Sequence, residues 1–167
     1  MEIVSPSIKY KNSYIQYIKE LGDETRYPFT LDFDYEDFNA LLIRLDEYEN
    51  GINLPEENVP STTLWMVEGQ ELIGVTNIRH CLNSRIEHCG GHIGLGIRPS
   101  CRGQKLGQLL MKSSIEKLRE MGTQHVHIHC YKANSASAYT IINNGGELES
   151  ELALGEETVQ RYVVKYT

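Results

Sequence analysis

The sequence predicts an α/β protein in which a mixed β-sheet is flanked by helices. Two observations support this fold class. Short segments rich in β-branched residues alternate along the chain with longer segments whose apolar residues recur at helical spacing. In addition, a strand-like segment at residues 91–97 leads through a polar loop into a helical pattern that starts at Leu106. Such a strand–loop–helix crossover is expected to connect parallel strands of one sheet.

The first half of the chain is predicted to contain a strand, two helices and a hairpin. Both helices are indicated by apolar stripes, and both end near a glycine. Asp34 has a short side-chain acceptor that can cap the second helix. The predicted elements are a strand at 3–10, a helix at 11–21, a helix from Asp34 to about Gly51, a loop at 51–63 and hairpin strands at 63–67 and 71–79.

The second half alternates strands and helices. Gly122 and the pair Gly145-Gly146 end its two helices. The predicted elements are a strand at 91–97, a helix from Leu106 to Gly122, a strand at 125–131, a helix at 134–143 and a final strand at 158–165. The whole order is one strand, two helices, three strands, and then helix, strand, helix, strand.

Length and composition are those of a single globular domain over residues 1–167. A formal net charge of -7 disfavours an extended nucleic-acid surface and favours cationic partners. No apolar run approaches the ~18 residues of a membrane-spanning helix, so we expect no membrane partner. The 4 cysteines have no CxxC spacing and no signal peptide is recognisable, so we expect free thiols in a cytoplasmic protein.

An anion-binding loop is predicted at residues 102–107, between a strand and a helix. Backbone N–H groups at a helix N-terminus, together with the helix dipole, favour phosphate. Gly103 and Gly107 permit close approach of a ligand, while Arg102 and Lys105 supply positive charge. This signal is weak by itself, because similar loops serve as plain connections. The glycine patterns of ATP-binding and NAD-binding loops are missing, which disfavours both nucleotides.

Residues 91–111 read GHIGLGIRPSCRGQKLGQLLM and resemble the GNAT acetyltransferase family. They match its fourth strand and its acyl-CoA pyrophosphate loop, whose pattern is Q/R-x-x-G-x-G/A. Arg102 and Gly107 fit that pattern, whereas Lys105 stands at its first glycine and restricts positive φ there. Residues 134–146 read NSASAYTIINNGG and resemble the second signature of the family. The resemblance extends over about residues 64–148.

The resemblance implies a GNAT-like sheet whose central parallel strands, the fourth and fifth, splay apart to admit acetyl-CoA as co-substrate. Backbone groups of the fourth strand would pair with pantetheine, and the loop would hold the pyrophosphate. The expected acetyl-CoA-binding residues are Leu95, Gly96, Ile97, Arg102, Gly103, Gln104, Lys105, Leu106, Gly107, Gln108, Asn134 and Ser137.

The catalytic residues are less clear. Many family members carry a tyrosine acid seven residues after the asparagine of the second signature, but this chain has Ile141 there. Tyr139 is two residues away and should face nearly the opposite side of the helix. A thiolate can leave without an acid, because a thiol is a weak base. His92 is the candidate proton relay, although a histidine beside a glycine in a strand is more often structural.

Three histidines, His125, His127 and His129, alternate along one predicted strand and therefore share one face. Alternate residues of a strand stand about 7 Å apart, and a line of three fits a tetrahedral metal centre poorly. We therefore expect no metal site here and interpret the histidines as polar packing beneath a helix.

The expected function is acetyl-CoA-dependent transfer of an acetyl group directly to an amine of a small molecule or peptide. The resemblance puts the acceptor groove in the N-terminal half, where the candidate residues are Tyr27, Phe29, Asp32, Phe33 and Asp34. The alternative is a non-catalytic acyl-CoA-binding sensor, suggested by Ile141 and Lys105. A purely structural interaction protein would make both signatures coincidental. A homodimer is compatible with the resemblance.

Overall fold

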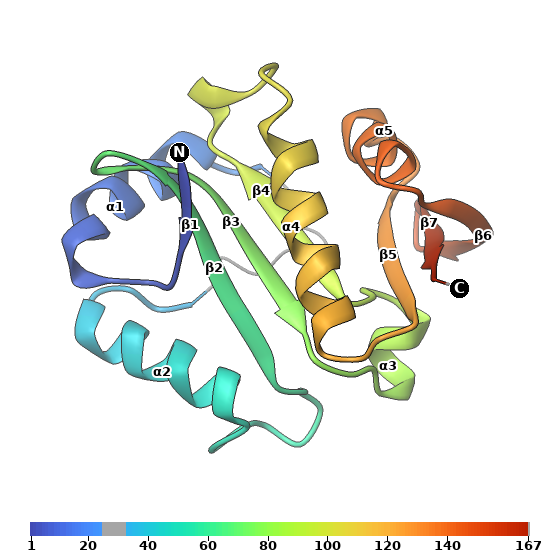
Figure 1. Ribbon diagram of the computed structural model, residues 1–167, viewed down its shortest axis with the longest axis horizontal. Coiled ribbons are helices and arrows are strands. Elements are labelled where there is room, and N and C mark those ends of the chain that lie inside the picture. The colour runs from blue at the N-terminus through green and yellow to red at the C-terminus, as the bar shows by residue number, and fades with distance from the viewer. Residues whose placement is uncertain (25–32, 167) are drawn as a thin grey trace.

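The computed structural model describes residues 1–24 and 33–166, and their strands form two antiparallel sheets (Figure 1). The first sheet has the order β1-β2-β3-β4 and the second has the order β5-β7-β6. The strands of the first sheet are β1 (Glu2–Val4), β2 (Ser61–Glu68), β3 (Glu71–Arg79) and β4 (Ile93–Ile97). Those of the second sheet are β5 (His125–Tyr131), β6 (Glu147–Leu154) and β7 (Glu157–Lys165). All pairs within the two sheets are antiparallel.

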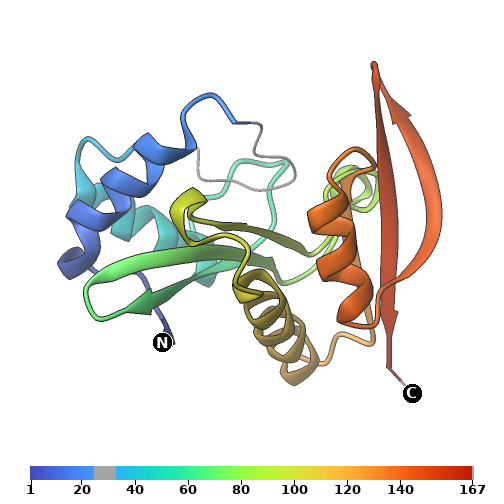
Figure 2. The ribbon, with the colours of Figure 1, turned by 90° about the horizontal axis from the view of Figure 1, so that it is seen from above.

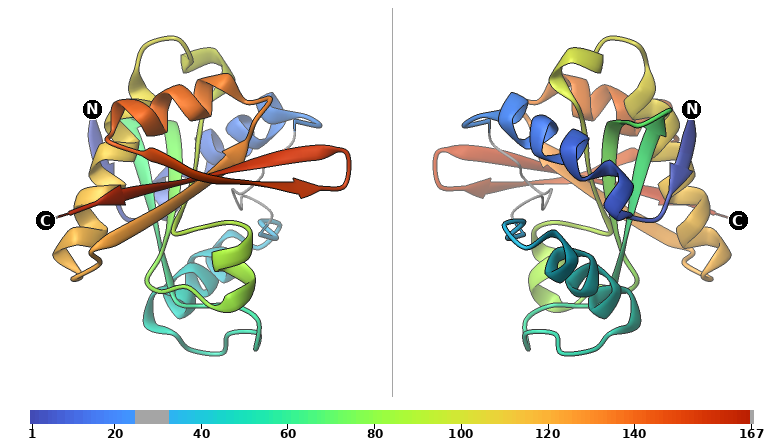
Figure 3. Two further views of the ribbon diagram at one scale, coloured as in Figure 1. Left: turned by 90° about the vertical axis from the view of Figure 1, so that its right-hand side faces the viewer. Right: turned by 90° about the vertical axis from the view of Figure 1, so that its left-hand side faces the viewer.

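Helices cover both faces of the first sheet. The helices are α1 (Lys11–Leu21), α2 (Phe38–Asn50), α3 (Ser84–His88), α4 (Leu106–Glu120) and α5 (Ser135–Asn143). Short 3₁₀ turns precede α1 at Ile8–Tyr10 and follow β4 at Pro99–Cys101. Figure 2 shows α1 and α2 on one side of the first sheet and α4 on the other. The second sheet lies beside α5, and its β6–β7 hairpin extends away from the other elements (Figure 3).

Two main clusters of buried side chains hold these layers together. An aromatic cluster between α1, α2 and the first sheet is centred on Trp65, which is fully buried and packs with Tyr10, Tyr14 and Phe38. A second, aliphatic cluster is shared by α4, α5 and both sheets, and Ile141 lies in it. Burying apolar area in this way provides most of the favourable free energy of folding. The two sheets are therefore joined through side chains under α4 and α5.

Strands β4 and β5 run in the same direction and separate towards their C-terminal ends (Figure 1). Among the described residues, their backbone pairing is limited to a bridge between Gly91 and Ile128. The crossover thus joins strands that run in the same direction, as expected, but β4 and β5 belong to two separate antiparallel sheets and not to one mixed sheet. Strand β5 instead finds its ladder partner in β7, along residues 125–131. The α/β class with flanking helices and splayed central strands is confirmed.

The predicted elements are present, with corrections at their ends and two additions. The first strand stops at Val4, and the second helix is capped by Asp37, whose side chain accepts from the N–H groups of Asn39 and Ala40. Strand β6 and the short helix α3 were not predicted. Strand β6 is glutamate-rich and mostly exposed, so it carries little of the alternating burial from which a strand is recognised.

Candidate functional site

The open edge of β4 is the first component of the site. On one side, Leu95 pairs with Thr76, Gly96 with Val75 and Ile97 with Gly74, all on β3. On the other side β5 has already diverged, so these three residues have no second ladder among the described strands. A strand edge of this kind presents N–H and C=O groups to an extended ligand. Leu95 and Gly96 are also partly exposed.

Unpaired amides at the start of α4 are the second component. The N–H groups of residues 103–107 find no acceptor among the described residues, and the first helical hydrogen bond is Gln108 N–H to the Lys105 carbonyl at 3.1 Å. Gly103 has φ +80°, and Lys105, the N-cap, has φ 61°. Consecutive N–H groups at a helix N-terminus form an anion-binding concavity. The predicted loop therefore has the donors that a pyrophosphate needs.

Gly107 provides a test of whether this concavity is built for a ligand. Its φ is not positive, so its backbone does not demand glycine. A Cβ at this position would lie 3.7 Å from Ile97 Cγ1 and 3.8 Å from Thr140 Oγ1, which are ordinary contacts. Packing within the protein therefore does not demand glycine either. A missing side chain between β4 and α5 leaves room for a ligand, and the site fits acetyl-CoA.

Arg102 is directed differently from our expectation. Its Nε donates to the Ile97 carbonyl at 2.9 Å, and its NH2 group donates to Glu24 Oε1 at 2.8 Å. Both contacts hold the loop against neighbouring segments of the protein. The Arg102 side chain is still 44% exposed, and one donor group of its guanidinium remains for a phosphate. Arg102 thus positions the loop in this structure, and direct contact with a pyrophosphate remains a prediction.

The second signature begins at the N-cap of α5. The Asn134 side chain accepts from Ser137 N–H at 3.1 Å, which is the usual role of an asparagine N-cap. The thiol of Cys130, on the neighbouring strand β5, is buried, and burial raises its pKa to about 11. Cys130 is therefore an uncharged core residue at neutral pH. Contact of Asn134 and Ser137 with pantetheine remains a prediction.

His92 is buried and already engaged. Its Nδ1 accepts from His127 N–H at 3.0 Å, so the neutral ring carries its proton on Nε2. The backbone N–H of His92 donates to the His127 carbonyl at 2.7 Å. Burial, reinforced by the nearby His127, lowers the pKa of His92 to about 4. These contacts fit a structural residue, and the role of His92 as a proton relay remains a prediction.

Two of the three β5 histidines, His127 and His129, contact residues 90–92 just before β4, and not a helix as we expected, while His125 is exposed. The helix-covered face of β5 carries Val126, Ile128 and Cys130, which are buried in the aliphatic cluster. On the opposite face, His129 Nδ1 accepts from Gly90 N–H at 2.9 Å, and its Nε2 is buried without a partner. Burial lowers the pKa of His129 to about 3, with Arg161 contributing. No metal-binding cluster of His, Cys, Asp or Glu exists in residues 1–24 and 33–166.

The position of the family tyrosine is occupied by a core residue. Ile141 is fully buried, whereas Tyr139 is 60% exposed on the same helix. The two side chains therefore face different directions, as the helical period predicts. In the proposed acceptor groove, Phe33 packs edge-on against Tyr48 and the Asp34 carboxylate accepts from Glu36 N–H. The other candidates there, Tyr27, Phe29 and Asp32, lie outside the described residues.

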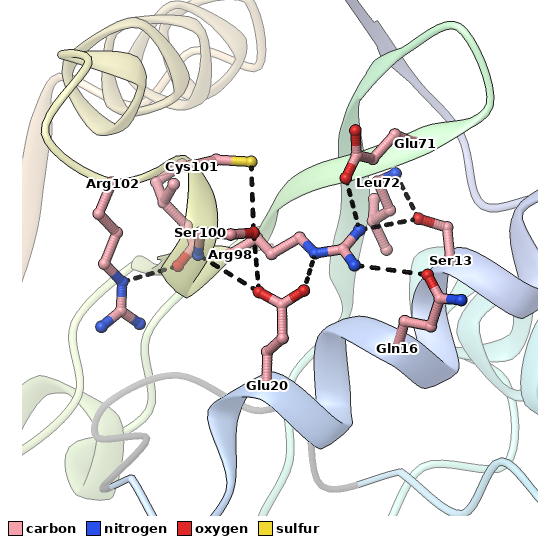
Figure 4. A network of polar contacts seen from close by, with 10 residues as sticks. Ser13, Gln16, Glu20, Glu71, Leu72, Arg98, Ser100, Cys101 and Arg102 are labelled. Atoms are coloured by element: carbon pink, nitrogen blue, oxygen red, sulfur yellow. Dashed lines mark hydrogen bonds and ion pairs between the residues drawn. The ribbon is translucent and has the colours of Figure 1, made fainter.

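Sequence reasoning missed a polar network around Arg98, directly after β4 (Figure 4). Arg98 is 5% exposed and contacts side chains of α1 and β3. Arginine is seldom buried unless its charge is paired, so this burial marks a specific role. The sequence signal was poor, because the partners of Arg98 on α1 lie about eighty residues earlier in the chain.

Comparisons with known proteins agree with this geometry. The model of the acetyltransferase (GNAT) family matches residues 17–140. The fold is similar to a ribosomal-protein-S5-alanine acetyltransferase from Vibrio fischeri, with TM-score 0.74, 13% identity, and 98% of this chain and 91% of that chain covered. It is also similar to a mutant of a spermidine N-acetyltransferase from Vibrio cholerae, with TM-score 0.67, 13% identity and coverages of 99% and 95%.

A third similar structure contains the expected ligand. A Salmonella typhimurium protein assigned as an acetyltransferase was solved with its cofactor acetyl-CoA, and it matches with TM-score 0.67, 12% identity and coverages of 98% and 92%. No curated protein matches the sequence significantly. In the part of the chain that the structure describes, no helix has the length and apolar character to cross a membrane. The chain belongs to the GNAT family and is an acyltransferase that uses acetyl-CoA.

Proposed function

We propose that the protein is an N-acetyltransferase that moves the acetyl group of acetyl-CoA directly to an amine of a small molecule or peptide. The observation that carries this proposal is the meeting of two unpaired backbone surfaces. The free edge of β4 ends at Ile97, and one short turn, residues 98–102, leads from it to the unpaired amides of residues 103–107. A single extended ligand with an amide-containing arm and a pyrophosphate satisfies both surfaces, and acetyl-CoA has both parts.

The chemical step needs little from the side chains. A neutral amine attacks the thioester carbonyl, the new C–N bond forms, the C–S bond breaks, and the amine proton passes to solvent. The departing thiolate is a much weaker base than an alkoxide, because thiols ionise at about 8.5, so it can leave first and take up a proton from solvent afterwards. Backbone N–H groups on the open edge of β4 are suited to stabilise the oxyanion. This route needs no acid from a side chain. It is therefore compatible with the buried Ile141, which stands at the position of the tyrosine acid.

The acceptor is proposed to be cationic before it loses its proton. The formal charge of -7 favours approach of positively charged molecules. Two similar structures carry names that specify spermidine and a ribosomal protein alanine as acceptors, and both are amines. These names concern those proteins, at 13% identity, and they select the compounds to be tested first.

Calorimetric titration of the purified protein with acetyl-CoA, CoA and ATP is the first test. We expect acetyl-CoA and CoA to bind with similar affinity and ATP to bind at least tenfold more weakly, because ATP lacks a pantetheine arm for the β4 edge. An amine panel with spermidine, amino acids and alanine-initiated peptides should then release free CoA thiol. Failure of acetyl-CoA to bind would overturn the proposal. Binding without turnover on any amine would favour the acyl-CoA sensor instead.

A further inference from the structure

The loop at residues 102–107 is the proposed acetyl-CoA loop, and a short turn connects it to β4. Side chains of α1 hold this turn in place, as Figure 4 shows. Arg98 lies at the start of this turn, and its side chain is 7% exposed. Its Nε donates to Glu20 Oε1 at 2.6 Å, and its NH1 group donates to Ser13 Oγ at 3.2 Å and lies 3.0 Å from Glu71 Oε1. Charge-assisted hydrogen bonds of this kind are stronger than neutral ones. Arg98 is therefore held in one place by α1 and β3 together.

Glu20 uses both of its carboxylate oxygens. Oε1 accepts from Arg98, while Oε2 accepts from the Ser100 hydroxyl at 2.8 Å and from the Ser100 N–H at 3.3 Å. Burial alone would raise the pKa of Glu20, but the hydrogen bonds from Ser100 and Arg98 outweigh it and the pKa is lowered. The carboxylate is thus charged at neutral pH. It connects the last turn of α1 to the 3₁₀ turn Pro99–Cys101.

The 3₁₀ turn leads directly into the acetyl-CoA loop. Arg102 follows it, and the unpaired amides of residues 103–107 come next. Arg102 is itself tied to Glu24, just beyond the end of α1. Glu20 in the last turn of α1 therefore binds the arginine before Ser100, and Glu24 just after α1 binds the arginine after it. A shift of this turn would displace the amides, because only two residues, Cys101 and Arg102, separate Ser100 from Gly103.

We propose that Glu20 is a positioning residue for acetyl-CoA binding: through Arg98 and Ser100 it fixes the turn that aims the amides of residues 103–107. This inference rests on the proposed acetyl-CoA site. Donors that are preorganised before the ligand arrives lower the entropic cost of binding. Loss of Glu20 leaves the amides in the chain but allows the turn to move, so ligand affinity falls without loss of any ligand contact from Glu20 itself.

Glu71 offers a matched control. It lies at the start of β3 and contacts the same guanidinium, but it has no contact with Ser100 or with the loop. Glu20→Gln and Glu71→Gln each remove one negative charge beside Arg98. Only Glu20→Gln also forces an amide NH2 donor against either Arg98 Nε or the Ser100 donors. The two variants therefore separate positioning of the loop from stabilisation of the buried arginine.

The test is calorimetric titration of both variants with acetyl-CoA, alongside thermal unfolding without ligand. We expect Glu20→Gln to raise Kd roughly five- to tenfold, since it disrupts charge-assisted hydrogen bonds, and Glu71→Gln to stay within about twofold. Ser100→Ala should raise Kd by about threefold, because the backbone N–H contact survives. A double variant should add little to Glu20→Gln, since both changes act on one contact.

The outcomes are separable. A merely structural role would lower the unfolding temperature of Glu20→Gln while its Kd for acetyl-CoA stayed equal to that of Glu71→Gln, and that result would overturn the inference. If Glu20→Gln unfolds too easily for titration, Ser100→Ala, which leaves the Arg98 pair intact, decides the question by the same measurement. Failure of the wild-type protein to bind acetyl-CoA would instead remove the proposed function on which the inference rests.

Discussion

The two ends of β4 differ in how their polar groups are satisfied. At its N-terminal end, the N–H groups of Gly90 and His127 are taken up by the imidazoles of His129 and His92, and all four groups are internal to the protein. At its C-terminal end, the amides of residues 103–107 are left without protein acceptors. Both ends carry basic side chains and glycines, so composition does not distinguish them.

In the proposed site, unpaired backbone groups are what the protein leaves for a ligand, and the chemically active side chains are not. The histidine-rich end looks reactive in the sequence, but the Nδ1 atoms of His92 and His129 each already accept from a backbone N–H. Buried polar groups are normally paired within the protein. Exposed, aligned and unpaired donors are consequently the stronger indication of a ligand.

A side chain at Gly107 should weaken acetyl-CoA binding beyond the C-terminal end of β4 more than any other change. Gly107→Val fills the space between Ile97 and Thr140, which the protein itself leaves free. We expect acetyl-CoA binding to weaken on the order of a hundredfold, because the ligand would lose its place beside the amides. The free energy of unfolding should change by less than about 1 kcal/mol, since valine and glycine have similar helix propensities. Calorimetry and urea unfolding measure the two quantities, and undiminished binding would contradict the site.

Acid should destabilise the histidine-rich region at the N-terminal end of β4. The lowered pKa values of His92 and His129, about 4 and about 3, mean that the unfolded chain takes up protons first as pH falls. Stability is therefore complete above about pH 6.5 and is lost as pH falls towards the folded values, by on the order of a few kcal/mol per ring and more for His129 than for His92. His129→Asn keeps an acceptor for Gly90 N–H and removes the titration.

Urea unfolding at pH 7, 6, 5 and 4 checks this expectation. The loss of stability between pH 6 and pH 4 should be smaller in His129→Asn than in the wild-type protein. His125→Asn is the matched control, because His125 is exposed at the start of the same strand. Equal pH dependence in all three proteins would show that the buried imidazoles do not govern acid stability.

Removal of Arg102 should weaken acetyl-CoA binding by a smaller amount. Arg102→Ala loses both the Ile97 carbonyl contact and a charge beside the loop. We expect Kd for acetyl-CoA to rise about five- to tenfold. Lys112→Ala removes an exposed charge from α4, the helix that follows the loop, and should leave Kd within about twofold. If the two variants weaken binding equally, the effect is one of general charge and not of loop position.

The smallest effect is expected at Lys105. Its φ of 61° is costly for a residue with a Cβ, and Lys105→Gly removes a strain of about 1 kcal/mol while adding a similar cost in backbone entropy. Stability should therefore change little, and acetyl-CoA binding should be retained or tighter by up to about threefold. Asn53→Gly, at the other non-glycine with positive φ among the described residues, is the control. A more than tenfold loss in Lys105→Gly would contradict the placement of the loop.

Much of the fold was predictable because its elements carry local signals. The helix at 11–21 and the strand at 125–131 were predicted with the bounds that the structure has, since a buried stripe or alternation defines each. Strand β6 was not predictable, because its conformation depends on pairing with β7 and not on burial of its own side chains. Asp34 and Asp37 are equally good helix caps in sequence. In the structure Asp37 is the cap, and Phe38, which follows it, packs in the aromatic cluster.

By itself, the sequence determined the α/β class, the position of the loop at residues 102–107 and the family, because glycines and basic residues at fixed spacing are local properties of a chain. The tertiary structure decided how those residues are used. It turned Arg102 towards Glu24, engaged His92 with β5, and connected Arg98 to Glu20. These pairings join segments that are far apart in sequence, and only the packing of α1 and β5 around β4 brings them within hydrogen-bond distance.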